Sequence, residues 1–313
     1  MTRKIIIDTD PGQDDAVAML LALASPEELD VLGIVTVAGN VDLAKTTRNA
    51  AKVLELAGHT DVPIHAGCDR PLRRPPITAE HVHGESGLDG PDLPEPTIGP
   101  REAHGVDFLI ETLRSGEPRT ITLCTLGPLT NIATALAKAP EIAGLVGEIV
   151  TMGGAYFEVG NITPTAEFNI FADPEAADLV LRSGIPIVMH PLDVTHRVLT
   201  TPARLERIGN LGNACGAAVA AMLSFSEKFD TEKYGSEGGP LHDPCVIAYL
   251  LQPHLFRGRT INVSVETAGE LTMGMTVADY WRITDRPHNV HFIRSVDDEG
   301  FFSLLIERLG RLP

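Results

Sequence analysis

The sequence predicts one α/β domain with a mostly parallel central sheet flanked by helices. Short apolar segments rich in β-branched residues alternate with helical segments along most of the 313 residues, and several of the apolar segments end in Gly, Asn or Asp. No repeat, low-complexity tract or linker-like change of composition divides the chain. Residues 1–313 are therefore expected to form a single domain.

The first half of the chain predicts three strand–helix units. Ile5, Ile6 and Ile7 form a β-branched run that enters a polar turn, and the Ala- and Leu-rich residues 16–24 read as the helix that follows. Gly58 is placed to end the second helix. The other segments expected here are strands over 29–40 and 62–66, a helix over 43–57, and a polar, Gly-rich lid or loop over 81–90.

The second half continues the alternation and ends differently. Asp173 and Pro174 predict the start of a helix, with Asp as the cap and Pro at the first helical position. Residues 230–240 are polar and Gly-rich, which predicts a second mobile loop. We expect strands over 120–126, 148–152 and 185–190, closing and partly antiparallel strands over 261–265, 280–283 and 289–294, and helices over 103–115, 130–139, 200–229, 244–250 and 298–309.

Charge and composition limit the partners of this chain. A formal net charge of −17 opposes contact with a polyanion, so we expect neither a nucleic-acid polymer nor a membrane as a partner. No segment approaches the roughly 20 apolar residues of a membrane span, and we expect no secretory signal, because the first residues lead directly into a predicted strand. The cysteines form no Cys-x-x-Cys pair, which favours free thiols in a cytoplasmic protein; they are Cys68, Cys124, Cys215 and Cys245.

Four carboxylates gather within eight positions where the first strand meets the first helix. They are Asp8, Asp10, Asp14 and Asp15. Aspartate often caps a helix N-terminus, but capping needs only one or two carboxylates. Carboxylates this close repel one another, and a bound cation would hold them together. Without Cys or a local His, the set suits Ca²⁺ or Mg²⁺ better than zinc.

Other polar residues follow later strands of the predicted sheet. Because the carboxyl ends of parallel strands share one edge, residues far apart in the sequence can meet there. These residues are Asn40, Asn161, Glu167, Asn169 and the pair His242-Asp243. A different interpretation is the Asp-x-Asp nucleophile of haloacid-dehalogenase-type phosphatases, which Asp8-Thr9-Asp10 imitates. Gly12 disfavours it, because those motifs usually carry Thr or Val at this position.

Six motifs in order resemble the inosine-uridine nucleoside hydrolases, the nucleoside N-ribohydrolases. They span nearly the whole chain, and the resemblance implies an open Rossmann-like fold and hydrolysis of the N-glycosidic bond of ribonucleosides, in purine or pyrimidine salvage. The motifs are Asp8-Thr9-Asp10-Pro11-Gly12-Gln13-Asp14-Asp15, His83-Gly84-Glu85-Ser86-Gly87-Leu88-Asp89-Gly90, Leu126-Gly127-Pro128-Leu129-Thr130-Asn131-Ile132-Ala133, Met152-Gly153-Gly154, Ala166-Glu167-Phe168-Asn169 and His242-Asp243.

The resemblance also implies a Ca²⁺ ion and a set of catalytic residues. The metal ligands would be Asp10, Asp15, Asp243 and the backbone carbonyl of Leu126, a position that is often Thr in relatives. Asp10 would accept the proton of the attacking water as general base. His242 would be the acid for the departing base, or at least a hydrogen-bond donor to it. Asp8 would orient the metal ligands from behind.

The remaining implied residues bind the nucleoside. Asp14 and Asn169 would bind the ribose 2′- and 3′-hydroxyls, with Asn40 also near the sugar. Asn161 and Glu167 would contact the 5′-hydroxyl, and Met152 and Phe168 would pack against the ribose or base. His83 would reach the substrate when its loop closes. Tyr234 resembles an aromatic residue of pyrimidine-preferring members, which favours pyrimidine bases as substrates. Relatives are commonly homodimers or homotetramers, so a homo-oligomer is expected. A non-catalytic nucleoside- or ribose-binding protein is the competing hypothesis, against which stand the complete set of metal carboxylates and His242.

Overall fold

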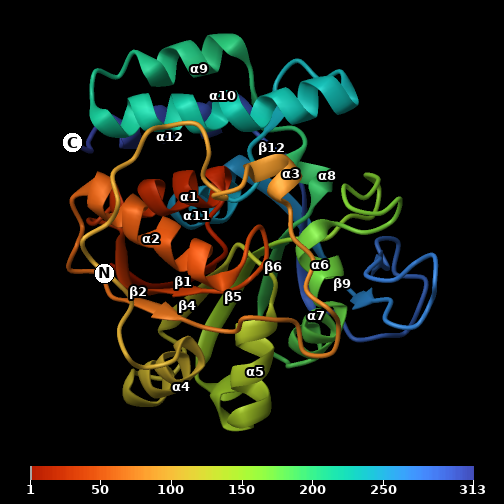
Figure 1. Cartoon of the computed structure of the whole chain (residues 1–313). Helices are drawn as coiled ribbons and strands as arrows, with labels where there is room; N and C mark the ends of the chain where they lie inside the picture. The colour runs from red at the N-terminus through yellow and green to blue at the C-terminus, as the bar shows by residue number, and fades with distance from the viewer. Residues whose placement is uncertain (1) are drawn as a thin grey trace.

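The structure is a computed structural model that describes residues 2–313, without the side chains of residues 229–234. Its centre is an eight-stranded sheet in the order β3-β2-β1-β4-β5-β6-β12-β9 (Figure 1). All neighbours pair in parallel except β12 and β9, which are antiparallel. The strands are β1 (Arg3–Thr9), β2 (Leu29–Thr36), β3 (Ile64–Ala66), β4 (Ile121–Thr125), β5 (Val146–Met152), β6 (Ile187–His190), β9 (Phe256–Ile261) and β12 (Val290–Val296). The predicted fold class is confirmed.

Helices cover both faces of this sheet. One layer consists of α1 (Gln13–Leu23), α2 (Leu43–Ala57), α10 (Ala214–Tyr234), α11 (Pro244–Leu251) and α12 (Asp298–Leu309), with α9 (Pro202–Gly209) outside it. The opposite layer consists of α4 (Gly105–Ser115), α5 (Thr130–Lys138) and α7 (Pro174–Leu181). Short helical segments complete the chain: α3 (Glu80–His83), α6 (Phe168–Ala172), α8 (Leu192–Thr195), and the 3-10 turns η1 (Pro140–Gly144) and η2 (Pro253–Leu255).

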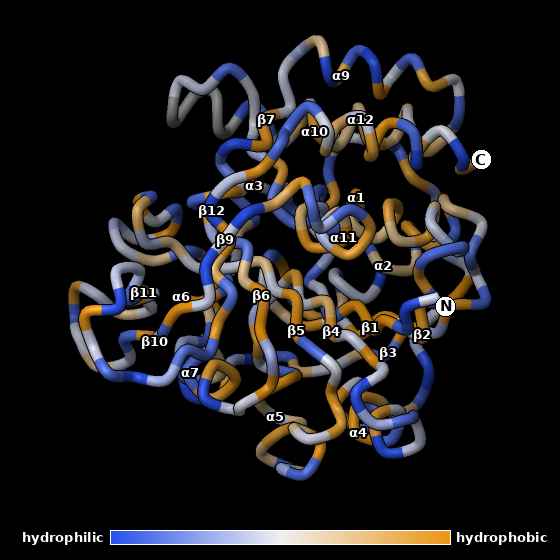
Figure 2. The backbone as a smooth tube through the Cα atoms, turned by 180° about the vertical axis from the view of Figure 1, so that it is seen from behind, coloured by the Kyte–Doolittle hydropathy of each residue, from blue (hydrophilic) through white to orange (hydrophobic). Residues whose placement is uncertain are grey.

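Successive side chains of a strand point to opposite faces of the sheet, so one sheet contributes to two hydrophobic cores. Ile5 and Ile7 pack into the core under α1 and α11, whereas Ile6 between them packs into the core under α4 and α5. All three side chains are fully buried, which stabilises the fold by about 1.5–3 kcal/mol each. The sheet is accordingly seen as a hydrophobic band through the middle of the molecule (Figure 2). A strand buried on both faces needs a continuous apolar run, as this one has.

The closing strands differ from the prediction. Residues 261–265 divide at Asn262 into the end of β9 and a separate strand β10 (Val263–Val265). β10 pairs antiparallel with β11 (Thr276–Ala278), and not with residues 280–283. The strand predicted over 280–283 is wrong: the Asp279 carboxylate accepts hydrogen bonds from the backbone N–H groups of Ile283 and Thr284, at 2.7 and 2.8 Å, and closes a turn there.

Two segments predicted as loops are more ordered than expected. α10 continues to Tyr234, so the loop predicted over 230–240 is confined to its second half, where Gly239–Pro240 (β8) pairs with Leu199–Thr200 (β7). In the 81–90 segment, the Asn49 side chain donates to the carbonyls of Pro11 and Ser86, at 3.0 and 2.9 Å. These bonds join the segment to the first turn of the chain. In the described residues no helix is both long and apolar enough to span a membrane.

Candidate active site

The predicted site residues meet at the carboxyl edge of the sheet. Threonines occupy the carboxyl ends of four adjacent strands there: Thr9 of β1 pairs with Thr36 of β2, and Thr125 of β4 pairs with Thr151 of β5. Just beyond these strand ends lies a pocket, as expected for an open α/β sheet. Eleven predicted residues line it: Asp14, Asn40, His83, Leu126, Met152, Asn161, Glu167, Phe168, Asn169, His242 and Asp243.

Asp10 does not itself line this pocket; it is buried behind the lining residue Asn40, and the backbone approaches it closely. Its Oδ2 accepts a hydrogen bond from the backbone N–H of Asn40 at 2.7 Å. A Cβ atom on Gly39 would lie 2.1 Å from Oδ2, and one on Gly127 would lie 2.3 Å from Oδ1, so only glycine fits at either position. Oδ1 is buried and has no hydrogen-bond partner among the described residues.

Asp15 is fixed by donors on its own turn. Its Oδ1 accepts from the Thr9 hydroxyl and, at 3.3 Å, from the backbone N–H of Asp10. Its Oδ2 accepts from the backbone N–H of Gly12 at 3.0 Å and from the Asn40 side chain at 3.2 Å. Asp15 therefore caps α1, as the capping interpretation expects, and also faces the other carboxylates. Asn40, predicted only to lie near the sugar, positions both Asp10 and Asp15.

The distant carboxylate of Asp243 completes the cluster. It precedes α11, and one carboxylate oxygen each from Asp14, Asp15 and Asp243 lie within 4.8 Å of one another. Asp10 lies outside this group of three, and Asp14, which was expected to bind ribose, lies inside it. Burial raises the pKa of all four carboxyl groups, and mutual repulsion raises those of Asp10, Asp15 and Asp243 further.

These observations fit a hard divalent cation. The donors are carboxylate oxygens, one of them with an unused buried lone pair, and their repulsion is what a dication would neutralise. The resemblance placed Asp8 behind the ligands, but its carboxylate contacts Asn131, whose side chain donates to it at 2.8 Å. Burial raises the pKa of Asp8 to about 7. The hydrogen bonds to the clustered carboxylates come from Thr9 and Asn40, and the orienting role of Asp8 stays a prediction.

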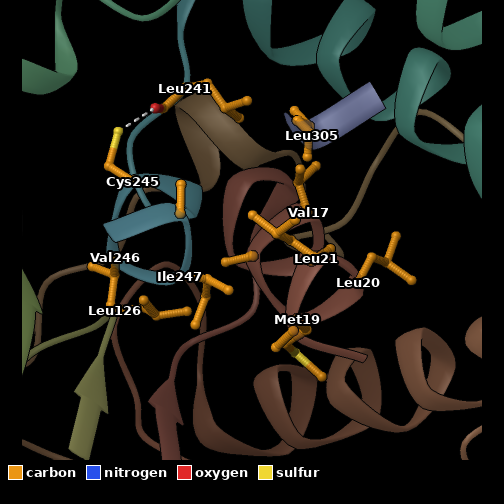
Figure 3. Close-up of a cluster of buried hydrophobic side chains, with 14 of the residues drawn as sticks. Val17, Met19, Leu20, Leu21, Leu126, Leu241, Cys245, Val246, Ile247 and Leu305 are labelled. Carbon is orange, nitrogen blue, oxygen red and sulfur yellow. Dashed lines mark hydrogen bonds between the residues drawn. The ribbon is translucent and has the colours of Figure 1, made fainter. Parts of the chain in front are cut away.

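The Leu126 carbonyl also belongs to the site. The Leu126 side chain packs in the hydrophobic cluster with Ile247 and Val246 (Figure 3), so only its backbone is available to the pocket. Its carbonyl oxygen accepts a hydrogen bond from the Asn169 side-chain amide at 2.6 Å. This contact brings a predicted metal ligand and a predicted ribose ligand together. It also explains how leucine can serve at a position where the side chain is not needed.

Glu167 has a structural role as a helix cap, which the sequence did not indicate. Its Oε1 accepts from the backbone N–H of Asn169 at 2.8 Å, and its Oε2 accepts from those of Gly154 and Ile170, at 2.9 and 3.2 Å. It thus caps α6 and fixes Asn169 in place. Burial raises its pKa to about 6. Asn161 accepts from the backbone N–H of Phe168 at 2.9 Å, and its predicted contact with the 5′-hydroxyl stays a prediction.

Two of the predicted histidines line the pocket. His242 Nδ1 lies 2.8 Å from the Thr195 hydroxyl, which leaves Nε2 for a ligand. Burial lowers the pKa of His242 to about 3, so the ring is neutral in this structure. His83 Nδ1 lies 2.6 Å from Gln13 Oε1, and burial lowers its pKa to about 4. The Gln13 amide also donates to the carbonyls of His83 and Asp89, both at 3.0 Å, which anchors the predicted lid to α1.

Several residues that line or support the pocket were not predicted from the sequence. His196 lines it, with its ring 5.6 Å from that of His242, and no motif marked it. Gly39 precedes the predicted residue Asn40, and Gly127 stands in one of the family motifs, but neither was assigned its contact with Asp10. The predicted pyrimidine contact Tyr234 lies outside the described side chains. The other unpredicted lining residues are Ala79, His81, Val82, Ile162, Leu223, Ser226 and Pro240.

Comparison with known proteins agrees with this fold and site. The chain matches the family described as inosine-uridine preferring nucleoside hydrolase over residues 5–303, and it belongs to that family. It is therefore an enzyme that hydrolyses N-glycosidic bonds of ribonucleosides. This excludes both alternatives, the non-catalytic binding protein and the phosphatase.

Individual relatives cover nearly the whole chain. It is 49% identical over 312 residues to the pyrimidine-specific ribonucleoside hydrolase RihA of Photobacterium profundum, covering 99% of each chain. It is 57% identical over 310 residues to an uncharacterized protein of Schizosaccharomyces pombe, covering 99% of this chain and 100% of that one. Among solved structures it resembles a plant nucleoside hydrolase (36% identity, TM-score 0.92, 99% of each chain) and the purine-preferring ribonucleoside hydrolase from Gardnerella vaginalis (33%, 0.91, 98% of each chain).

Proposed function

We propose that this enzyme uses Ca²⁺ to hydrolyse pyrimidine ribonucleosides to free base and ribose, as a step of nucleoside salvage. The observation that carries the proposal is the carboxylate cluster of Asp14, Asp15 and Asp243, of which Asp14 and Asp243 line a pocket together with uncharged hydrogen-bonding side chains. The carboxylates suit a cation, and the uncharged polar side chains of the pocket suit an uncharged sugar. Both suit a nucleoside better than a nucleotide, whose phosphate the carboxylates would repel.

The ligands proposed for Ca²⁺ are Asp10, Asp15, Asp243 and the Leu126 carbonyl. The free Oδ1 of Asp10 supports its place in this set, because a buried carboxylate oxygen needs a partner. Asp14 and Asn169 are proposed for the ribose hydroxyls, and the bond from Asn169 to the Leu126 carbonyl supports their closeness to the ion. The chemistry that such a cation supplies when bound is activation of water near neutral pH.

The residues then divide the reaction between them. Asp10 would accept the proton of the attacking water at Oδ1, while the backbone N–H of Asn40 holds Oδ2. The bond from the ribose carbon to the base nitrogen lengthens towards an oxocarbenium-like state. Asp14, Asn161, Glu167 and Asn169 would hold the sugar, so that its binding energy positions the reacting carbon.

His242 is proposed to assist the departing base. When the Thr195 hydroxyl donates to Nδ1, the neutral ring carries its proton on Nε2, which can hydrogen-bond to the base. We expect His242→Ala to lower kcat for uridine about 10²-fold or more, within the usual range for acid–base assistance. p-Nitrophenyl riboside needs no such help, so its kcat should fall much less. An equal loss with both substrates would contradict this role.

Base preference is proposed from the relatives. The RihA relative at 49% identity is named pyrimidine-specific, whereas the purine-preferring structure shares only 33%. We expect kcat/KM for uridine and cytidine to exceed that for inosine and adenosine by at least tenfold, measured as release of reducing sugar. A higher value for inosine would refute the pyrimidine preference and leave the hydrolase activity standing.

The cellular setting is also a proposal. The four cysteines are free thiols in the structure, which supports a reducing compartment such as the cytoplasm. Assembly into a homodimer or homotetramer is proposed from the family resemblance. Sedimentation velocity of the Ca²⁺-loaded enzyme would measure it directly.

A further inference from the structure

The outer edge of the main sheet carries a second pocket, which shares no lining residue with the nucleoside pocket. Its volume is about 340 Å³, and its lining consists of Arg197, Arg257, Gly258, Tyr280, Arg294 and Ser295. Three arginines thus face one pocket of a chain whose net charge is −17. In the part of the chain that the structure describes, none of the three forms an ion pair with a carboxylate.

A β-bulge brings two of these arginines together. On β12 and β9, Ile293 pairs with Gly258 and Ser295 pairs with Arg257, which leaves Arg294 as the extra residue. Bulges of this kind redirect a side chain. A Cβ atom on Gly258 would lie 2.3 Å from the Phe292 carbonyl oxygen, so glycine permits the close approach of the strands here. Arg257 and Arg294 consequently reach the same pocket from neighbouring strands.

The contacts that position the guanidinium groups leave their charge uncompensated. Arg294 Cζ lies 3.8 Å from the centre of the Phe157 ring and 5.1 Å from that of Tyr280. Stacking on aromatic faces orients a guanidinium group and leaves its N–H edge available. Arg197 Nε donates to the Asp193 carbonyl at 3.2 Å, which leaves its terminal nitrogens available. Three cations held together in this way repel one another unless an anion binds.

We propose that this pocket binds a phosphate group, either free phosphate or the phosphoryl group of a small phosphate monoester. Arginine presents paired N–H donors that match the oxygens of phosphate, and a dianion with several oxygens can contact three guanidinium groups at once. The Ser295 and Tyr280 hydroxyls add neutral donors at the same pocket. The site is distinct from the hydrolase site and does not depend on the function proposed for it.

The two pockets are neighbours, so the test must separate them. His196 lines the nucleoside pocket and Arg197 lines the second one. The backbone N–H groups of Tyr156 and Phe157 also donate to the Asp193 carboxylate, at 3.0 and 2.7 Å, and the same loop continues to the nucleoside-pocket residue Asn161. Phosphate binding should therefore be measured with the nucleoside pocket saturated by ribose.

Isothermal titration of the Ca²⁺-loaded enzyme tests the proposal directly. The probes are inorganic phosphate and glycerol phosphate, in buffer without free Ca²⁺ and at constant ionic strength set with sodium chloride. We expect saturable binding with one site per chain for at least one probe, and the stronger probe identifies free phosphate or a monoester as the ligand. Arg257→Ala should weaken this binding at least tenfold. Arg207→Ala, at an exposed arginine of α9, should leave it unchanged.

Two results would overturn the proposal. One is equal binding by wild type and Arg257→Ala. The other is the absence of saturable binding for both probes; if Arg257→Ala then also changes sedimentation, the arginines belong to a subunit contact. Because heat is measured and not hydrolysis, either result leaves the proposed activity untouched.

Discussion

Replacement of Asp10 by alanine is expected to lower kcat for uridine about 10³-fold or more. The change removes the proposed proton acceptor, which alone accounts for 10²–10⁴-fold in typical enzymes, and one proposed Ca²⁺ ligand as well. The fold should survive, because the Asp10 carboxylate accepts its hydrogen bond from the backbone of one residue, Asn40, and lies among carboxylates that repel it. Single-turnover kinetics and thermal melting of the same sample measure both expectations.

A matched aspartate variant makes this result interpretable. Asp30→Ala removes an exposed carboxylate of β2, away from the cluster, and should keep kcat within about twofold of wild type. Asp10→Asn retains the size of the side chain while removing its charge, and should be impaired nearly as much as Asp10→Ala. Turnover by Asp10→Ala within tenfold of wild type would refute its proposed role as general base.

The strand–helix framework was predictable because its signals are local. Ile5 to Ile7 form a continuous apolar run that only a strand buried on both faces requires, and the Asp173-Pro174 pair marks the start of α7 as expected, with Asp173 accepting from the Ala176 N–H at 3.1 Å. The turn at Asp279 was not predictable in this way. Its apolar neighbours Trp281 and Ile283 resemble a strand, yet both are exposed.

The residues that act at a distance were harder to identify. Asp243 belongs to the cluster only because α11 packs beside α1, which a local pattern does not show. The resemblance to a family supplied that residue. It did not indicate that Glu167 caps α6 or that Asn40 binds two of the aspartates, because both tasks depend on backbone atoms of other segments. Hydrogen bonds between side chains and remote backbone are the part of a site that residue spacing specifies least.

Removal of the cation should destabilise the protein as well as inactivate it. Four clustered carboxylates repel one another when nothing neutralises them, and burial with this repulsion already raises the pKa values of Asp10 and Asp243 well above the usual range. A cation present at about 100 times its Kd stabilises the folded state by about 2.7 kcal/mol. We therefore expect chelation to lower Tm by several degrees and to abolish hydrolysis, with Ca²⁺ restoring both.

The cluster itself provides the control for this experiment. Asp243→Asn removes one charge and one ligand while it keeps the size of the side chain, so its Tm should respond much less to chelator or to added Ca²⁺. A shift of equal size in wild type and Asp243→Asn would place the stabilising ion elsewhere. Full activity of thoroughly chelated enzyme would contradict a catalytic cation. Because Mg²⁺ demands stricter octahedral geometry at shorter distances than Ca²⁺, recovery with Ca²⁺ at lower concentration than with Mg²⁺ is the outcome expected of this carboxylate-rich site.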